Sequence, residues 1–214
     1  MNPRDITIIR KIVYLWRNYK QKCSYNKGTN NKIINEGVVR VSSRIQINGE
    51  GNKIVLGKGS VLLNSLIKIQ GNDNEIILNS NSYIQGAEIW IQDNKCVISI
   101  GDNSFIGRHT HLACTEDGSK LIVGNDCMIS SNVQVRTGDS HHIFDMDDNR
   151  INQAQSVFIG DHCWLGEGSK VLKGVVLEGD DIVSTGAIVT KSFGKNMLLG
   201  GVPAKVLKEE VNWK

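Results

Sequence analysis

The sequence predicts an all-β protein of the parallel β-helix class, and three observations support this. Aliphatic residues return every six residues from position 159 onward. The same six-residue template recurs upstream in other phases. The composition, with 22 Gly, 2 Pro and 6% aromatic residues, suits a core of stacked Ile, Val and Leu. The most regular aliphatic positions are Ile159, Leu165, Val171, Leu177, Val183 and Val189.

A strict period of six fits neither a helix nor a lone strand. An α-helix repeats every 3.6 residues, so six residues turn it by about 600° and the aliphatics would leave any single face. A strand has period two, which does not select every third inward position. A short strand followed by a tight turn satisfies the pattern, and such hexapeptides are typical of a parallel β-helix. Three of them would complete a triangular coil of about 18 residues.

The β-helix is expected to span residues 33–200. Its second half repeats from Ile100 and Val123 onward, and the Gly, Asn or Asp after each aliphatic supplies turn chemistry because these residues tolerate positive φ. The first half is predicted to be imperfect. Its strand-like segments are irregularly spaced, at residues 45–47, 54–56, 67–69 and 76–78.

The N-terminal residues 1–32 are predicted to form a helix and a linker. Residues 4–23 place apolar side chains close to helical spacing with Arg and Lys between them, which favours an amphipathic α-helix. That helix would pack on the body or on a neighbouring subunit. The alternative is peripheral contact with anionic lipid at the inner membrane, because basic residues flank Trp16. Residues 24–32 are polar and are predicted to be a linker.

Residues 136–158 form the largest break in the repeat. The aliphatic phase before this segment, at Val123, Ile129 and Val135, is the phase of Ile159 after it. We therefore expect a loop that protrudes from the solenoid and returns to the same edge. Long loops on rigid scaffolds usually carry function. After Gly200 the sequence leaves the repeat, and residues 201–214 are predicted to be a polar tail.

Charge and cysteine content exclude several classes of protein. Residues 1–32 hold eight Lys or Arg and one acid, so they carry +7 of a total of +3 and leave −4 on the remainder. This distribution argues against a nucleic-acid-binding body. The five Cys show no paired spacing, which argues against a disulfide framework and a zinc site. Cys127 and Cys163 are expected to pack in the core. No signal peptide or membrane span is evident, so a cytoplasmic location is expected.

The loop contains the best candidates for catalysis. His141 and His142 can accept a proton near neutral pH, and Asp139 or Asp145 could hold the other ring nitrogen of a histidine. The alternative is that two histidines in an Asp-rich loop are simply solvated. Trp164 occupies a hexapeptide position at the edge of the solenoid, where it would either pack at a contact or form a flat wall for a ligand.

Four features in order resemble the hexapeptide-repeat acyltransferases, most closely the bacterial sugar O-acetyltransferases that modify capsule or lipopolysaccharide. They are the repeats over 159–194, the Trp at 164, the loop segment 139–145 and the ending Gly201-Val202-Pro203-Ala204-Lys205-Val206. The resemblance covers residues 97–208 well and 33–96 loosely. It implies a left-handed parallel β-helix, a homotrimer with sites between subunits, acetyl-CoA as co-substrate and a sugar or polysaccharide acceptor.

The resemblance also implies roles for individual residues. His141 would deprotonate the acceptor hydroxyl, which attacks the thioester directly, and Trp164 would line the acceptor and pantetheine site. CoA-contacting positions would be Gly166, Thr185, Gly186, Thr190, Lys191, Lys205 and Lys208. Lysines suit this role because CoA carries several negative charges. Glu167 departs from the small residue common beside the thioester.

Three alternatives remain at the level of the sequence. The first is an N-acetyltransferase acting on an amino-sugar nucleotide, since an amine also needs a base. The second is a non-catalytic β-solenoid that binds or scaffolds. The third, a zinc-dependent carbonic anhydrase with the same fold, is disfavoured because the five His lack that family's spacing, so no metal is expected.

Overall fold

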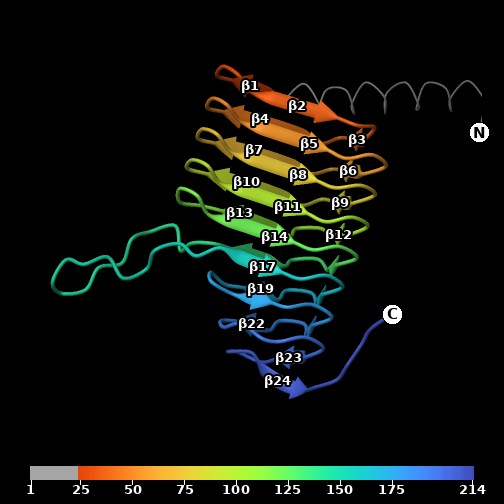
Figure 1. The fold of residues 1–214 in the computed structure, drawn as a ribbon, viewed down its shortest axis with the longest axis vertical. Coiled ribbons are helices and arrows are strands. Elements are labelled where there is room, and N and C mark those ends of the chain that lie inside the picture. Colours follow the sequence, from red (N-terminus) through yellow and green to blue (C-terminus); the bar gives the residue numbers. More distant parts are fainter. Residues whose placement is uncertain (1–23) are drawn as a thin grey trace, which may run out of the picture.

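The computed structural model describes residues 24–214, and this part of the chain contains strands and turns but no helix. The strands stack in parallel into three sheets that run along a solenoid (Figure 1). The predicted all-β, parallel β-helix architecture is therefore confirmed. The helix predicted over 4–23 lies outside the described residues. Within residues 24–214 no helix is long and apolar enough to cross a membrane.

Each turn of the solenoid contributes one strand to each sheet. The eight-stranded sheet contains β1 (Tyr25–Lys27), β4 (Arg44–Asn48), β7 (Leu66–Gln70), β10 (Glu88–Gln92), β13 (His111–Cys114), β16 (Gln134–Arg136), β19 (Lys170–Val171) and β22 (Ile188–Val189). The seven-stranded sheet contains β2 (Lys32–Asn35), β5 (Lys53–Leu56), β8 (Glu75–Leu78), β11 (Val97–Ile100), β14 (Lys120–Val123), β17 (Val157–Ile159) and β20 (Val176–Leu177).

The nine-stranded sheet closes the triangle. It contains β3 (Val39–Val41), β6 (Val61–Leu63), β9 (Tyr83–Gln85), β12 (Phe105–Ile106), β15 (Met128–Ile129), β18 (Trp164–Leu165), β21 (Ile182–Val183), β23 (Leu198–Gly200) and β24 (Lys205–Lys208). All its pairs are parallel except β23 with β24, which is antiparallel.

The length of a coil changes along the solenoid. Paired residues such as Ile45 and Ile67 lie 22 residues apart in the first half, whereas Leu165 and Val183 lie 18 apart. The prediction of 18-residue coils therefore holds only for the C-terminal part. The prediction of an irregular first half was wrong. It repeats regularly with a longer period, because β4, β7 and β10 each have five residues and point two Ile inward.

The core is the predicted stack of aliphatic side chains. All six of the most regular aliphatics, from Ile159 to Val189, are at most 1% exposed. Cys127 and Cys163 are buried as expected. Burial raises the pKa of Cys127 to about 11, so this thiol is not ionised at neutral pH.

Both ends of the solenoid extend beyond the predicted boundaries. The expected linker 24–32 contains β1, because Tyr25–Lys27 pairs with Gln46–Asn48 of β4. The expected tail 201–214 contains β24, which caps the last coil by pairing with β23. The strand register therefore reaches further in both directions than the aliphatic pattern does.

The outer faces of the three sheets differ in chemistry. An in-register apolar row crosses the nine-stranded sheet: Val39, Val61, Tyr83, Phe105, Met128, Trp164, Ile182 and Leu198. The central row of the seven-stranded sheet is also apolar apart from one serine: Ile34, Val55, Ile77, Ser99, Ile122, Phe158 and Val176. The eight-stranded sheet is instead mainly polar outside.

Candidate active site

The loop predicted over 136–158 is confirmed as an excursion from one coil. It leaves β16 after Arg136 and returns at Val157 in β17, and both strands stay in register with the preceding coil. It therefore emerges at the corner between the eight-stranded and seven-stranded sheets. Figure 1 shows it extending well away from the body of the solenoid.

The outer part of the loop is an antiparallel hairpin. Ile151 N donates to Ile143 O at 2.9 Å, and Phe144 bridges to Arg150. Asp145 closes the turn, because its Oδ1 accepts hydrogen bonds from the backbone N–H groups of Asp147 and Asn149, both at 2.9 Å. The bond from the Asn149 backbone holds the pKa of Asp145 below its usual value. Asp145 therefore shapes the loop.

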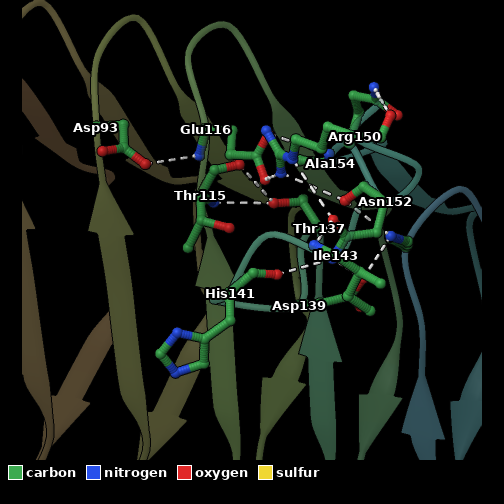
Figure 2. Close-up of polar contacts among 12 residues, drawn as sticks. Asp93, Thr115, Glu116, Thr137, Asp139, His141, Ile143, Arg150, Asn152 and Ala154 are labelled. Carbon is green, nitrogen blue, oxygen red and sulfur yellow. Dashed lines mark hydrogen bonds and ion pairs between the residues drawn. The ribbon is translucent and has the colours of Figure 1, made fainter. Parts of the chain in front are cut away.

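The root of the loop is fastened to the preceding coil by a polar cluster (Figure 2). Arg150 pairs with Glu116, and Glu116 Oε2 also accepts from Ala154 N at 3.2 Å. The Arg150 guanidinium lowers the pKa of Glu116 from its usual value. Thr137 Oγ1 donates to Thr115 O at 3.1 Å. These contacts fix where the two arms of the loop leave the solenoid.

Asn152 fixes the backbone at His141. It is buried, and its Nδ2 donates to His141 O at 2.8 Å and to Asp139 Oδ2 at 3.0 Å. Its Oδ1 accepts from Ile143 N at 2.7 Å. Asn152 was not singled out from the sequence, where it is one polar residue among many. The His141 side chain is exposed, and in Figure 2 its ring points away from Asp139 and Asn152.

The structure gives Asp139 a different partner from the predicted one. Its carboxylate pairs with Lys173, which follows β19 and also donates to Asn152 O at 3.1 Å. The bond to Lys173 is the main reason that the pKa of Asp139 lies below its usual value. Within residues 24–214 neither Asp139 nor Asp145 contacts a histidine ring. The expected pairing of an aspartate with the His141 imidazole is therefore not present in the single chain.

Trp164 lies in a shallow groove on the nine-stranded sheet. Its ring is 37% exposed, and its Nε1 donates to Ser130 Oγ at 3.3 Å. The groove has a volume of about 400 Å³, and Gly166, Thr185 and Leu198 also line it. A Cβ on Gly166 would lie 2.7 Å from Thr185 N, so only glycine allows the coils to stack this closely here. Three predicted site residues thus meet in one groove.

The remaining residues expected to contact CoA are spread over the last coils. Gly186 follows Thr185 in a turn with φ +70°, and its N–H donates to Glu167 O at 2.8 Å. Thr190 and Lys191 are exposed directly after β22. Lys205 and Lys208 are the end residues of β24 and are also exposed. The structure thus groups Gly186 with the groove and places the other four at the end of the solenoid.

Trp213 is a neighbour of Trp164 that the sequence analysis missed. Its ring stacks on His162 with centroids 4.4 Å apart, and its Nε1 donates to His162 O at 2.8 Å. His162 Nδ1 also lies 3.1 Å from Asp180 Oδ1. The Trp213 and Trp164 ring centroids are 6.2 Å apart. The C-terminal segment therefore contributes an aromatic side chain beside the groove, although it lies outside the repeat.

Comparison with known proteins identifies the repeat. The model of the family described as hexapeptide repeat of succinyl-transferase matches residues 156–191. The polysialic acid O-acetyltransferase of Escherichia coli O1:K1 / APEC is 32% identical over 113 residues, which cover 50% of this chain and 37% of that protein. The crystal structure of the polysialic acid O-acetyltransferase OatWY is 28% identical with a TM-score of 0.85, covering 88% of this chain and 90% of that one. The chain belongs to the hexapeptide-repeat acyltransferase family.

Another relative extends the comparison. The putative lipopolysaccharide biosynthesis O-acetyl transferase WbbJ of Escherichia coli (strain K12) is 30% identical, covering 49% of this chain and 56% of that protein. The chain thus spans about half or less of the length of these curated relatives. The structure of the polySia specific acetyltransferase NeuO matches with a TM-score of 0.80 and 28% identity, covering 88% of this chain and 80% of that one.

In this hexapeptide-repeat acyltransferase, the loop and the groove belong to different sides of the triangle. His141 follows the corner between the eight-stranded and seven-stranded sheets, whereas Trp164 lies on the nine-stranded sheet opposite that corner. Figure 1 shows the loop projecting from the side opposite β3, β6, β9 and β12 of the nine-stranded sheet. If His141 and Trp164 act on one substrate, they must therefore come from two copies of the chain.

Proposed function

We propose that this protein transfers an acetyl group from acetyl-CoA to a sugar hydroxyl of a bacterial surface polysaccharide or its precursor. The observation that carries the proposal is the pair of features just described. A histidine stands on a rigidly rooted loop, and an aromatic groove lies where a neighbouring copy would meet that loop. The family membership supports acyl transfer, and the names of the relatives support an O-linked polysaccharide acceptor.

The groove fits the donor in shape and chemistry. It offers an apolar wall at Trp164 and Leu198 and a close backbone at Gly166, which suit a narrow pantetheine arm. Exposed Lys191, Lys205 and Lys208 supply positive charge for phosphates further along the chain end. When bound, the thioester supplies the acetyl carbonyl that the acceptor attacks.

His141 would act as the general base. Its exposed imidazole accepts the proton of the acceptor hydroxyl as the oxygen forms a bond to the acetyl carbon. The bond from that carbon to sulfur breaks, and the proton passes from His141 to the departing thiolate. Asn152 holds the backbone of His141 and thereby sets the position of the ring. In this arrangement Asp139 acts through Asn152 and Lys173.

The outer faces suggest how copies associate. A closed ring of three copies requires one face of each copy to contact a different face of the next. The apolar rows on the seven-stranded and nine-stranded sheets are suited to be these two faces. Because the loop emerges at the edge of the seven-stranded sheet, this contact would bring it beside the neighbour's Trp164. The proposed homotrimer thus completes a site that one chain lacks.

Mixed oligomers provide the decisive experiment. We expect His141→Ala and Trp164→Ala each to lose most acetyl transfer from acetyl-CoA, since each removes one half of every site. Refolding the two variants together should restore about a quarter of the wild-type rate, because in random rings about that share of sites combines an intact loop with an intact groove. His142→Ala serves as the control with near-normal activity. No recovery on mixing would place both residues in a single-chain site and reject the shared one.

The acceptor chemistry is tested in the same assay. Hydroxyl sugars, amino-sugar nucleotides and an acidic polysaccharide are offered side by side with acetyl-CoA. Transfer to the hydroxyl acceptors is expected, while exclusive transfer to an amine would establish the N-acetyltransferase alternative. No transfer to any acceptor would favour a non-catalytic solenoid.

A further inference from the structure

The outward face of the eight-stranded sheet carries a polar surface that the proposed chemistry does not use. We call the outward side chains of β1, β4, β7, β10, β13, β16 and β19 the cationic face. Its Lys and Arg residues are Lys27, Arg44, Lys68, Arg136 and Lys170, and the acid among the outward residues of these strands is Glu88. Because the chain beyond residue 32 carries −4, this excess of positive charge is a local feature.

The centre of the cationic face is an aromatic residue between two basic ones. Lys68 Nζ lies 5.2 Å from the centroid of the Trp90 ring, and the His111 ring stacks on Trp90 at 5.9 Å. Burial lowers the pKa of His111 from its usual value, so at neutral pH it is a hydrogen-bonding group without charge.

Two N–H donors on this face lack partners. Trp90 Nε1 and Arg136 Nε are shielded from solvent, and neither has a hydrogen-bond partner within residues 24–214. An unpaired buried donor costs about 1–3 kcal/mol, so such groups usually mark a binding contact that the isolated chain lacks. Both donors belong to the central row of the face.

The cationic face connects a groove with the root of the loop. At one edge a groove of about 340 Å³ is lined by Arg44, Glu88, His109 and His111. At the other edge the Arg136 guanidinium bonds Ser140 Oγ, one residue before His141. Strands lie about 4.8 Å apart, so the face from β4 to β19 is about 24 Å long. It is long enough to follow an extended chain rather than a single small molecule.

The face also remains available when copies associate. If the apolar rows of the other two sheets form the contacts of the ring, the eight-stranded sheet is the one left facing solvent. This step rests on the proposed function. Outward amides at Gln46, Asn48, Gln70 and Gln92 lie beside the cations and would suit sugar hydroxyls.

We propose that the cationic face binds an acidic polysaccharide chain and leads it to the loop that carries His141. Carboxylates along the polymer would pair with Arg44, Lys68 and Lys170, and the free donors of Trp90 and Arg136 would bond to sugar oxygens. The acceptor would thus be held at several points remote from the reacting hydroxyl, which raises affinity for long chains over short ones.

Direct binding tests the surface without requiring catalysis. The full chain is titrated with polysialic acid, with uncharged dextran and with dextran sulfate at low and physiological salt. We expect polysialic acid to bind and to weaken as salt rises, and dextran not to bind. The double variant Arg44→Glu/Lys68→Glu should bind polysialic acid at least about tenfold more weakly. Lys58→Glu, at an exposed turn outside the face, is the matched control and should bind normally.

Chain-length kinetics test the link to the site. The double variant should raise KM for long polysialic acid while leaving transfer to a short sialic acid oligomer unchanged. The neutral variant Arg44→Gln/Lys68→Gln, with its melting temperature compared to wild type, covers misfolding of the charge-reversed protein. Equal binding by wild type and both variants, equal binding of dextran, or tighter binding of dextran sulfate than polysialic acid would overturn the proposal. If no acceptor is acetylated, the titration still decides the surface and the proposed function alone fails.

Discussion

The two halves of the solenoid bury the same kind of core with coils of different length. Coils of 22 residues carry two inward Ile on each long strand and a buried Asn at a turn, as at Asn52 and Asn74. Coils of 18 residues carry one aliphatic per face and a small residue before it, as at Cys163 and Ser169.

The Asn residues of the long coils form a hydrogen-bonded ladder. Asn74 N donates to Asn52 Oδ1 at 3.0 Å, and Cys96 N donates to Asn74 Oδ1 at 2.9 Å. Asn74 Nδ2 also donates to Asp93 O at 2.9 Å. The longer turns expose more backbone to desolvation, and the Asn side chains satisfy it. The short coils need no such ladder, and they carry the groove and follow the loop of the proposed site.

The largest expected effect separates chemistry from stability. His141→Ala should lower acetyl transfer by about 100-fold or more, because a general base contributes on that order. The free energy of unfolding should not change, since the contact recorded for His141 is through its backbone carbonyl. Steady-state rates and urea unfolding measure the two effects. A loss of activity below threefold would remove His141 from the mechanism.

A second pair of variants compares the two kinds of coil directly. Asn74→Ala should lower the free energy of unfolding by about 2–4 kcal/mol, because it leaves a buried N–H and a buried carbonyl unpaired. Ser169→Ala, at the inward small position of a short coil, should change it by less than about 0.5 kcal/mol because Ser169 Oγ has no partner. Urea unfolding at pH 7 measures both. Equal effects would show that the coils do not differ as described.

The loop provides an intermediate effect. Asn152→Ala should lower kcat by about tenfold, since a misplaced base loses part of its contribution. The pH dependence of kcat should keep its shape, because Asn152 positions His141 without titrating. Gln153→Ala, in the exposed neighbour, is the control. A shifted pH profile for Asn152→Ala would mean that Asn152 acts on the ionisation of the base rather than on its position.

The smallest expected effect concerns a buried acid in a short coil. Asp181 stands where other repeats have a small residue, and burial raises its pKa to about 6. The folded state therefore holds a proton that the unfolded state releases near pH 4. Stability from Asp181 is present below pH 4 and is lost as pH rises to about 6, by about 1–3 kcal/mol.

Asp181→Asn should flatten this dependence. Urea unfolding of wild type and variant at pH 4, 5, 6 and 7 should diverge as pH rises, with the wild type losing more stability. Asp102→Asn, in an exposed turn, is the control and should follow the wild type. Parallel curves for Asp181→Asn and wild type would mean that Asp181 is already charged in the folded protein at pH 4.

The comparison also shows how far sequence reasoning reaches. In the short coils every aliphatic from Ile159 onward was predicted to point inward, because one inward residue per hexapeptide leaves a visible period. In the long coils the period is 22, and Ile45-Gln46-Ile47 was recognised as a strand without its repeat at Ile67 and Ile89. The phase across the loop predicted its return, since a register error would have turned Ile159 outward.

The sequence by itself determined the solenoid, the place of the loop and the burial of the thiols, because each follows from local periodicity along the chain. Only the tertiary structure decided the partners. It brought Lys173 to Asp139 and Trp213 to His162, and it placed His141 and Trp164 on opposite sides of the triangle. These contacts join residues from different coils and faces, and their distances depend on how coils stack, which no pattern of neighbouring residues records.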